Sequence, residues 1–302
     1  MEWTPKDRAR QKELQAKLFG TRDGVAKIME EAEPAEVLEF QHYRARSHQK
    51  FFHYTSLTAL LGMLETKCLY LPDLRESNDL REAGGLENVG TGRLYAASFS
   101  WPNKESIAMW WMYGLKGTTN PRQRVPVRLE FNGDAVRADV EKARASRKQF
   151  GGKVDFYDVI YRDYRREPGE ANTWYLNGRP VRMAWHFRSG AGRNVFGDDR
   201  GLVKDRGWDY ERETRIRVDL PDAEVPRIEI PFEEALKSAK VLVGPGQSAS
   251  DYLKIAQRKL EPWGIEATPS RCKVRFPEWN PMNETGRPRG RQSGQAFFGT
   301  NT

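Results

Sequence analysis

The sequence has very little cysteine and histidine. Of its 302 residues, two are cysteine and four are histidine, and none of them has the spacing of a structural zinc site. Cys68 and Cys272 stand among apolar residues of strand-like segments, which is typical of reduced thiols in a cytoplasmic protein. We therefore expect no metal, no disulfide and a cytoplasmic location.

Long apolar runs and nucleotide-loop motifs are also missing. No stretch is apolar over the roughly 20 residues that a membrane span needs, and the first residues do not resemble a signal peptide. No GxGxxG follows a strand and no GxxxxGKS or GxxxxGKT occurs, while the GPG of residues 244–246 is too short for a phosphate loop. These absences argue against a membrane protein, a Rossmann enzyme and a kinase-like protein.

Acidic residues are fewer than basic ones. Lys and Arg total 50 against 42 Asp and Glu, a net charge of +8, and the isoelectric point is near 9.4. A basic protein attracts polyanions and anionic ligands, although net charge does not specify a fold. A non-catalytic nucleic-acid-binding protein is therefore one alternative, with an arginine-containing tail and exposed aromatic residues as its contacts.

The chain divides into three segments by pattern. Residues 1–50 are highly charged and predominantly helical, and residues 277–302 are rich in Gly, Pro, Asn and Arg, which is typical of a disordered basic tail. Between them, residues 51–276 alternate many short strands with few helices and have too few βαβ spacings for a doubly wound sheet. We predict an α+β domain there, preceded by a helical extension.

Four polar or aromatic blocks exceed what their predicted elements require. They are His53–Ser56 between a strand and a helix, Asn78–Glu82 in a loop, Ser98–Tyr113 from a strand end into a helix, and Lys204–Arg217. The last block belongs to a strand predicted over residues 209–220, on which Glu211, Glu213 and Arg215 share one face. A surface ladder of salt bridges explains those charges equally well, and packing of an aromatic strand end explains His53 and Tyr54.

Taken together, the blocks resemble the ordered signature of the bacterial domain-of-unknown-function family 2971. The segments that carry the resemblance are HYTS (53–56), ND (78–79), SFS (98–100), WWMYG (110–114) and WDYERETR (208–215). The resemblance covers residues 51–276 and leaves out the extension and the tail. The family name implies no activity.

The same order is similar to that of ADP-ribosyltransferases, including DNA-modifying enzymes of the DarT type, and to tRNA 2′-phosphotransferases. This resemblance implies a split mixed β-sheet of the ADP-ribosyltransferase type with flanking helices, and NAD as the substrate. It implies that His53 binds the NAD ribose, that Ser98 and Ser100 support the nicotinamide pocket, and that Glu213 or Glu211 carries the chemistry. Further NAD contacts are implied for the remaining matching positions, which are Tyr54, Thr55, Asn78, Trp111, Tyr113 and Arg215.

The chemistry of such a site suits these residues. Loss of nicotinamide turns the ribose into an oxocarbenium ion, which a carboxylate stabilises as in glycoside hydrolysis. The resemblance implies that the second Glu of Glu-x-Glu, Glu213, contacts the ribose and that Glu211 serves the acceptor. Nicotinamide leaves as a neutral ring, so a site with few histidines needs no strong general acid.

The sequence therefore predicts an NAD-dependent ADP-ribosyltransferase that modifies a macromolecule, either nucleic acid or protein, as a toxin or phage-defence effector. An antitoxin or other partner protein would accompany such an activity. An NAD-using RNA 2′-phosphotransferase is the alternative enzyme. In a purely structural protein, every polar block would be solvated surface.

Overall fold

The computed structural model describes residues 4–19, 33–77, 93–115, 125–148, 153–162, 173–176, 179–182, 201–220, 225–245 and 249–272. Asn78 and the predicted tail lie outside these residues.

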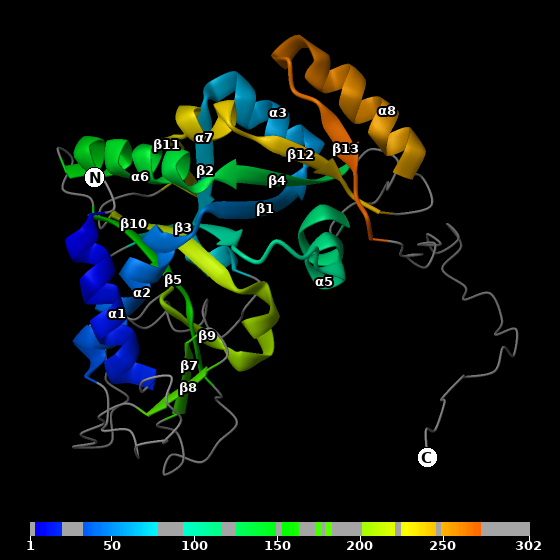
Figure 1. Ribbon diagram of the computed structural model, residues 1–302. Coiled ribbons are helices and arrows are strands. Elements are labelled where there is room, and N and C mark those ends of the chain that lie inside the picture. The colour runs from blue at the N-terminus through cyan, green and yellow to red at the C-terminus, as the bar shows by residue number, and fades with distance from the viewer. Residues whose placement is uncertain are drawn as a thin grey trace, which may run out of the picture.

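Helices and strands alternate along the chain (Figure 1). The helices are α1 (Pro5–Phe19), α2 (Pro34–Ser47), α3 (Leu57–Thr66), α5 (Ile107–Met109), α6 (Gly133–Lys148), α7 (Glu233–Lys237) and α8 (Ala249–Leu260), with shorter turns η1 (Leu74–Glu76), η2 (Trp110–Leu115), η4 (Arg206–Glu211) and η5 (Glu261–Trp263). The strands are β1 (Lys50–Ser56), β2 (Cys68–Pro72), β3 (Arg93–Ser100), β4 (Pro126–Asn132), β5 (Lys153–Asp158), β6 (Ile160–Arg162), β7 (Thr173–Leu176), β8 (Arg179–Arg182), β9 (Val203–Asp205), β10 (Glu213–Leu220), β11 (Arg227–Pro231), β12 (Lys240–Val243) and β13 (Ala267–Pro269).

A mixed sheet of seven strands forms the centre of the fold, in the order β13-β12-β4-β1-β3-β10-β5. Its strand pairs are antiparallel except for β12 with β13. Two smaller sheets accompany it, β11-β2 and β8-β7-β6-β9. The predicted α+β class, with a large mixed sheet and flanking helices, is confirmed.

Strand β1 passes into α3 at Ser56, which is one of the two residues, with Thr55, that the sequence offers as the N-cap. The Ser56 hydroxyl accepts a hydrogen bond from the backbone N–H of Ala59 (3.2 Å), which caps the helix. The apolar side chains of α3 then enter the main core at helical spacing: Leu57, Leu60, Met63 and Leu64. Lys67, in the left-handed conformation with φ 55°, ends the helix, and β2 follows at once.

The two faces of the central sheet differ in chemistry. On β10, Ile216 and Val218 lie in the main core with Phe99 and Phe156, as their alternation predicts. Helices α3, α6, α7 and α8 contribute to that core, so we call this side the core face. The alternate side chains of β10, beginning with Glu213, lie on the opposite side, which we call the polar face.

The surface-ladder interpretation of β10 is wrong. Glu213, Arg215 and Arg217 on the polar face are only 2%, 2% and 3% exposed. Buried charges depend on their partners far more than exposed ones do, because the surrounding solvent no longer screens or stabilises them. The contacts of these side chains are therefore structural or functional, and not a solvated pattern.

The predicted start of this strand is also wrong. Residues 206–211 form η4, which begins where the Asp205 side chain accepts a hydrogen bond from the Gly207 N–H (2.8 Å). Arg212 then adopts a left-handed conformation with φ 46°, and β10 starts at Glu213. Glu211 therefore precedes a sharp turn and does not lie on the strand.

Strands β1 and β3 are barely paired. Their register contains a single position, Phe52 with Ser100, whereas the register of β3 with β10 runs from Glu213–Ser100 to Leu220–Arg93. Side chains also join the two strands: His53 Nδ1 lies 2.9 Å from the Ser98 carbonyl oxygen, and the Phe51 ring lies 6.0 Å from that of Phe99. Backbone pairing is therefore sparse at the middle of the central sheet, between β1 and β3.

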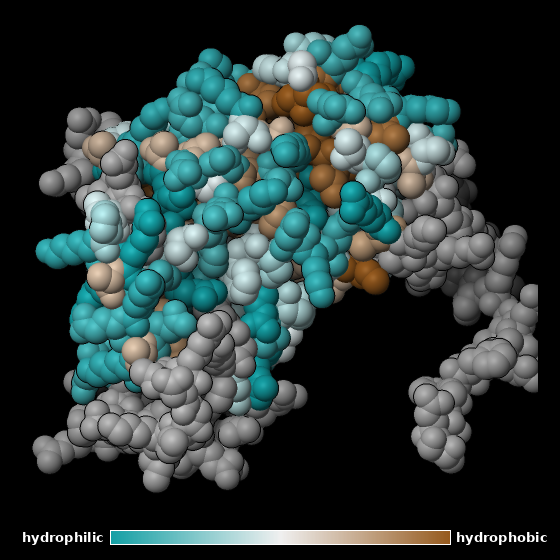
Figure 2. Space-filling model, in the orientation of Figure 1, coloured by the Kyte–Doolittle hydropathy of each residue, from teal (hydrophilic) through white to brown (hydrophobic). Residues whose placement is uncertain are grey.

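The N-terminal helices lie beside the smaller four-stranded sheet and β5 (Figure 1). A second core joins them to β6 and β9, through residues such as Leu14, Phe40, Tyr161 and Val203. The described helices include none with the length and apolarity of a membrane span. Figure 2 shows a mainly hydrophilic face on which apolar atoms gather between α3 and α8, beside the main core.

Gly201 provides a test of the packing over the polar face. Its φ is +72°, and a Cβ there would lie 2.6 Å from Leu74 Cδ1, so Gly201→Ala combines backbone strain with a clash. We expect a loss of about 2–3 kcal/mol in the free energy of unfolding. Gly264 has a similar φ of +66° but nothing within 4 Å of its Cβ position, so Gly264→Ala should cost only about 1 kcal/mol. Urea denaturation measures both, and equal losses would contradict the clash.

Candidate functional site

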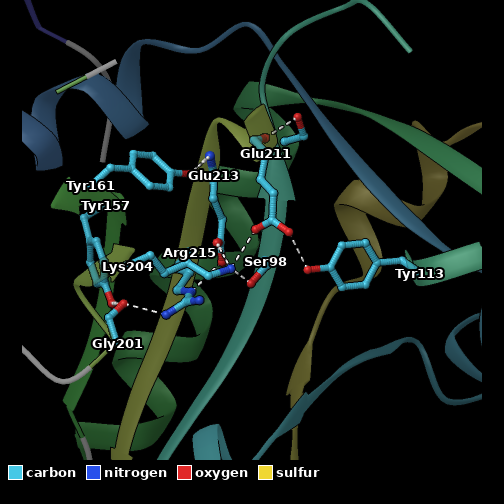
Figure 3. Close-up of polar contacts among 10 residues, drawn as sticks. Ser98, Tyr113, Tyr157, Tyr161, Gly201, Lys204, Glu211, Glu213 and Arg215 are labelled. Atoms are coloured by element: carbon cyan, nitrogen blue, oxygen red, sulfur yellow. Dashed lines mark hydrogen bonds and ion pairs between the residues drawn. The ribbon is translucent and has the colours of Figure 1, made fainter. Parts of the chain in front are cut away.

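Four charged side chains meet on the polar face at the start of β10 (Figure 3). Lys204, Glu211, Glu213 and Arg215 are each at most 5% exposed. Lys204 Nζ donates to Glu211 Oε2 (2.6 Å) and to Glu213 Oε2 (3.0 Å). Arg215 Nε donates to Glu213 Oε1. Two carboxylates and two cations thus form a buried cluster without net charge.

Neutral groups complete the hydrogen bonding of the two glutamates (Figure 3). The Ser98 hydroxyl donates to Glu213 Oε1, and the Tyr113 hydroxyl donates to Glu211 Oε1 (2.7 Å). The backbone of both residues is held as well. The Tyr161 hydroxyl accepts from the Glu213 N–H (3.0 Å), and Ser100 donates to the Glu211 carbonyl oxygen (2.7 Å).

The local backbone explains how two glutamates two positions apart reach one ammonium group. The left-handed Arg212 reverses the chain between them, so Glu211 approaches from η4 while Glu213 approaches from β10. Lys204 comes from β9, whose partner in the parallel pairing is β6. Arg215 also donates through Nη1 to the Gly201 carbonyl oxygen (2.7 Å), which ties the segment before β9 to β10.

The two carboxyl groups have pKa values shifted in opposite directions. Burial raises the pKa of Glu211, and repulsion from Glu213 adds to this effect, while Lys204 opposes it. Burial also disfavours ionisation of Glu213, but Arg215, Lys204 and the Ser98 hydroxyl outweigh it and hold the pKa of Glu213 well below its usual range. Glu213 is therefore firmly ionised, and Glu211 is the member of the pair that takes up a proton first.

Tyr113→Phe tests the contact between η2 and the cluster. The change removes one hydrogen bond to a buried carboxylate, which is worth about 1.5–3 kcal/mol of unfolding free energy. We expect a loss in that range by urea denaturation, and a further rise in the pKa of Glu211. Tyr70→Phe is the control, because the hydrogen bonds of its hydroxyl to described residues go to the exposed Thr66 (3.2 Å) and to the Gly62 carbonyl oxygen (3.4 Å). A loss no larger than that of the control would show that the Tyr113 bond is not made in solution.

Of the residues that the sequence selected, those on β3, η2 and β10 come together. Ser98, Ser100, Tyr113 and Arg215 all contact Glu211 or Glu213, as described above. Trp111 is 41% exposed on η2. The cluster thus unites residues that are up to 115 positions apart in the chain and that contact one another through side-chain hydrogen bonds.

The β1 residues are arranged differently. His53 and Thr55 pair with Leu129 and Val127, so both lie on the core face, and the His53 ring is 5.6 Å from that of Phe99. Burial lowers the pKa of His53, which keeps its ring neutral. His53 therefore contacts β3 through the Ser98 backbone, while the Ser98 side chain points to the opposite face, toward Glu213.

Tyr54 does lie on the polar face. Its hydroxyl accepts a hydrogen bond from the Ser106 N–H (3.0 Å), and its ring packs edge-on against Trp110 at 5.0 Å. This places Tyr54 under the α5–η2 segment. Its contacts are with that segment, and no hydrogen bond joins it to Glu211 or Glu213.

Sequence reasoning assigned no role to Lys204, Tyr161 or Gly201. Lys204 opens the last polar block but stands seven positions before Glu211, on another element, so no spacing rule links the two. The Tyr161 hydroxyl bonds the Glu213 backbone N–H, and Gly201 contributes its backbone carbonyl oxygen. A pattern of residue types predicts neither contact. A lysine after the apolar residues 202–203 was the one available signal.

Among the described residues, no group of three or more His, Cys, Asp or Glu side chains could hold a metal ion. The chain matches no protein-family model, no curated protein and no solved structure. The resemblance to family 2971 and to ADP-ribosyltransferases therefore stays a prediction from the order of the motifs.

Proposed function

We propose that this chain is an NAD-dependent ADP-ribosyltransferase that transfers ADP-ribose to a macromolecular acceptor. The observation that carries the proposal is the buried pair Glu211 and Glu213, whose pKa values are shifted apart. Two neighbouring carboxyl groups with opposite shifts are the usual sign of two different acid–base roles in one site.

Glu213 has the properties that the first step requires. Cleavage of the bond between nicotinamide and ribose develops positive charge on the sugar, and a fixed, ionised carboxylate stabilises that charge. Ser98 and Arg215 hold Glu213 Oε1 in place. A carboxylate offers about four acceptor positions, so with these two donors and Lys204 bound, Glu213 retains one for a ribose hydroxyl.

Glu211 suits the second step. A general base works best when its pKa lies near the working pH, and the pKa of Glu211 is raised toward that range by burial. Among the described residues, Tyr113 and Lys204 are the two donors to its carboxylate oxygens, which leaves acceptor positions for the nucleophile of an acceptor. In this proposal Glu211 removes a proton from that nucleophile as it attacks the ribose.

The separation of β1 from β3 supports the same proposal. A split sheet is the feature that the resemblance implies, and the single paired position of these strands, Phe52 with Ser100, lies beside Glu213, which pairs with Ser100 on β10. In this proposal NAD enters on the polar face at that separation. His53 is then a positioning residue, which holds β1 against the Ser98 carbonyl oxygen and does not itself reach the ribose.

The test is incubation of the purified protein with NAD labelled in the adenylate part, with and without a cell lysate. We expect nicotinamide release, and label transferred to a macromolecule that is then identified as protein, DNA or RNA. Transfer of the 2′-phosphate from a 2′-phosphorylated RNA to the ADP-ribose part of NAD, with loss of nicotinamide, would instead identify the phosphotransferase alternative. Nucleic-acid binding that is unaffected by NAD, without any nicotinamide release, would identify the non-catalytic one.

A further inference from the structure

Arg128, on β4, is a buried cation that has no carboxylate partner among the described residues. The residue is 3% exposed, and Nη2 donates to the Asn103 carbonyl oxygen (3.1 Å) while Nε has no partner. The guanidinium carbon lies 3.9 Å from the centre of the Phe52 ring and 5.6 Å from that of Tyr54. The ring faces partly stabilise the charge, but no anionic side chain in the part of the chain that the structure describes pairs with it.

Two other buried arginines of the polar face each have a carboxylate that neutralises their charge. Arg215 and Arg217 are as buried as Arg128, and each has a carboxylate, Glu213 for the first and Asp155 at 2.7 Å for the second. A buried guanidinium without such a partner costs several kcal/mol. An unsatisfied buried group of this kind needs an explanation beyond packing.

The acidic side chains near Arg128 are bound to other groups. Glu130, two positions away on β4, pairs with Lys50 at 2.7 Å. Glu105 accepts hydrogen bonds from the Trp110 indole (3.1 Å), the Ser270 hydroxyl and the Arg271 N–H (3.0 Å). Burial raises the pKa of Tyr54, so its phenol is neutral and supplies no negative charge.

The register places Arg128 on the same face as the glutamate cluster. Arg128 on β4 pairs with Tyr54 on β1, and its guanidinium lies over the ring of Phe52, also on β1. Phe52 pairs with Ser100 on β3, and Ser100 pairs with Glu213 on β10. Neighbouring strands are about 4.8 Å apart. The guanidinium over β1 is therefore about 10 Å from β10, across the place where β1 and β3 separate.

We propose that Arg128 binds a phosphate group of an anionic ligand. If the function proposed above holds, this group is the diphosphate of NAD, which lies on the side of the ribose away from nicotinamide. The planar fork of arginine matches phosphate oxygens, and the free Nε gives it a donor to spare. The Asn103 carbonyl oxygen accepts the hydrogen bond of Nη2, and Asn103 is itself exposed. In this proposal the ligand displaces residues 101–106 from the guanidinium.

The experiment measures the thermal stability of the full chain against inorganic pyrophosphate, ADP-ribose and nicotinamide. Ligands that bind only the folded state raise Tm, so pyrophosphate and ADP-ribose should each raise it by a few degrees and nicotinamide should not act through Arg128. In Arg128→Met the pyrophosphate shift should vanish, while the variant without ligand is at least as stable as the wild type. Lys240→Met, which removes an exposed charge on the neighbouring β12, should keep the shift.

Arg128→Lys provides a second test in case Arg128→Met fails to fold. It keeps the charge but loses the fork, and the Kd for pyrophosphate should rise about tenfold. Unchanged affinity in both Arg128 variants, or no pyrophosphate shift in the wild type, overturns the proposal. Pyrophosphate binding at Arg128 in a protein that never cleaves NAD would retain this site and refute the proposed function, so the two failures are distinguishable.

Discussion

Glu213→Gln should lower the rate of nicotinamide release by about 10²- to 10⁴-fold, the range for losing one preorganised electrostatic contact to a transition state. The amide keeps the shape of the side chain and can still accept from Ser98, but it carries no charge to stabilise the ribosyl cation. Both hydrolysis of NAD and transfer to an acceptor should fall together, because both pass through that cation. The measurement is initial rate against NAD concentration, with Tm to verify folding.

Glu211→Gln is the matched comparison, since it makes the same chemical change two positions earlier. It should spare hydrolysis and reduce transfer, because water needs less activation than a positioned acceptor. Near-normal hydrolysis in Glu213→Gln together with its loss in Glu211→Gln would mean that the two roles are exchanged. If neither substitution alters the rate, the cluster serves stability alone and the enzyme proposal loses its main support.

Lys204→Met is expected to have the largest effect on stability. It leaves Glu211 and Glu213 buried with one cation, Arg215, instead of two, and breaking a buried ion pair in this way costs about 3–5 kcal/mol. Urea denaturation at pH 8 should show the loss. Lys142→Met is the control, because Lys142 pairs with Glu234 on the surface (3.1 Å), where a salt bridge contributes only about 0–1 kcal/mol.

The loss of unfolding free energy in Lys204→Met should depend on pH in a defined direction. Glu211 already has a folded-state pKa above its ordinary value, and removing the ammonium raises this pKa further. A carboxyl group of this kind stabilises the fold when protonated, and that contribution disappears as the pH rises through the folded-state pKa. The difference in unfolding free energy between Lys204→Met and the wild type should therefore become smaller from pH 8 to pH 5. A gap that widens toward pH 5 would contradict the assignment of Lys204 as the counter-ion of Glu211.

Residue pattern alone predicted several local features correctly. The hydroxyl of Ser56 caps α3, and Ile216 and Val218 face the core. These features depend on neighbours within a few positions: an N-cap bonds three residues ahead, and a strand alternates at period two. The same rules placed Glu211 on the strand, which is wrong. The residue types of 209–212 do not predict the left-handed Arg212 that ends η4.

The side of the sheet on which a residue lies was harder to predict. His53 and Ser98 appear together in the motif order, and they do touch. The register of β1 with β4 nevertheless places the His53 side chain with Leu129 on the core face. A shift of one residue in strand register exchanges the two faces of a strand, and register is set by pairing between segments more than 70 positions apart.

By itself, the sequence determined the α+β class, the core face of β10 and several of the residues that meet in the candidate site, because period and composition are local properties of the chain. The tertiary structure alone decided that Lys204 joins Glu211 to Glu213 and that Arg128 is buried without a carboxylate. Both depend on where strands from distant segments meet. The free energy of a buried charge is set by the groups that surround it in space, and those neighbours exist only once the sheet has formed.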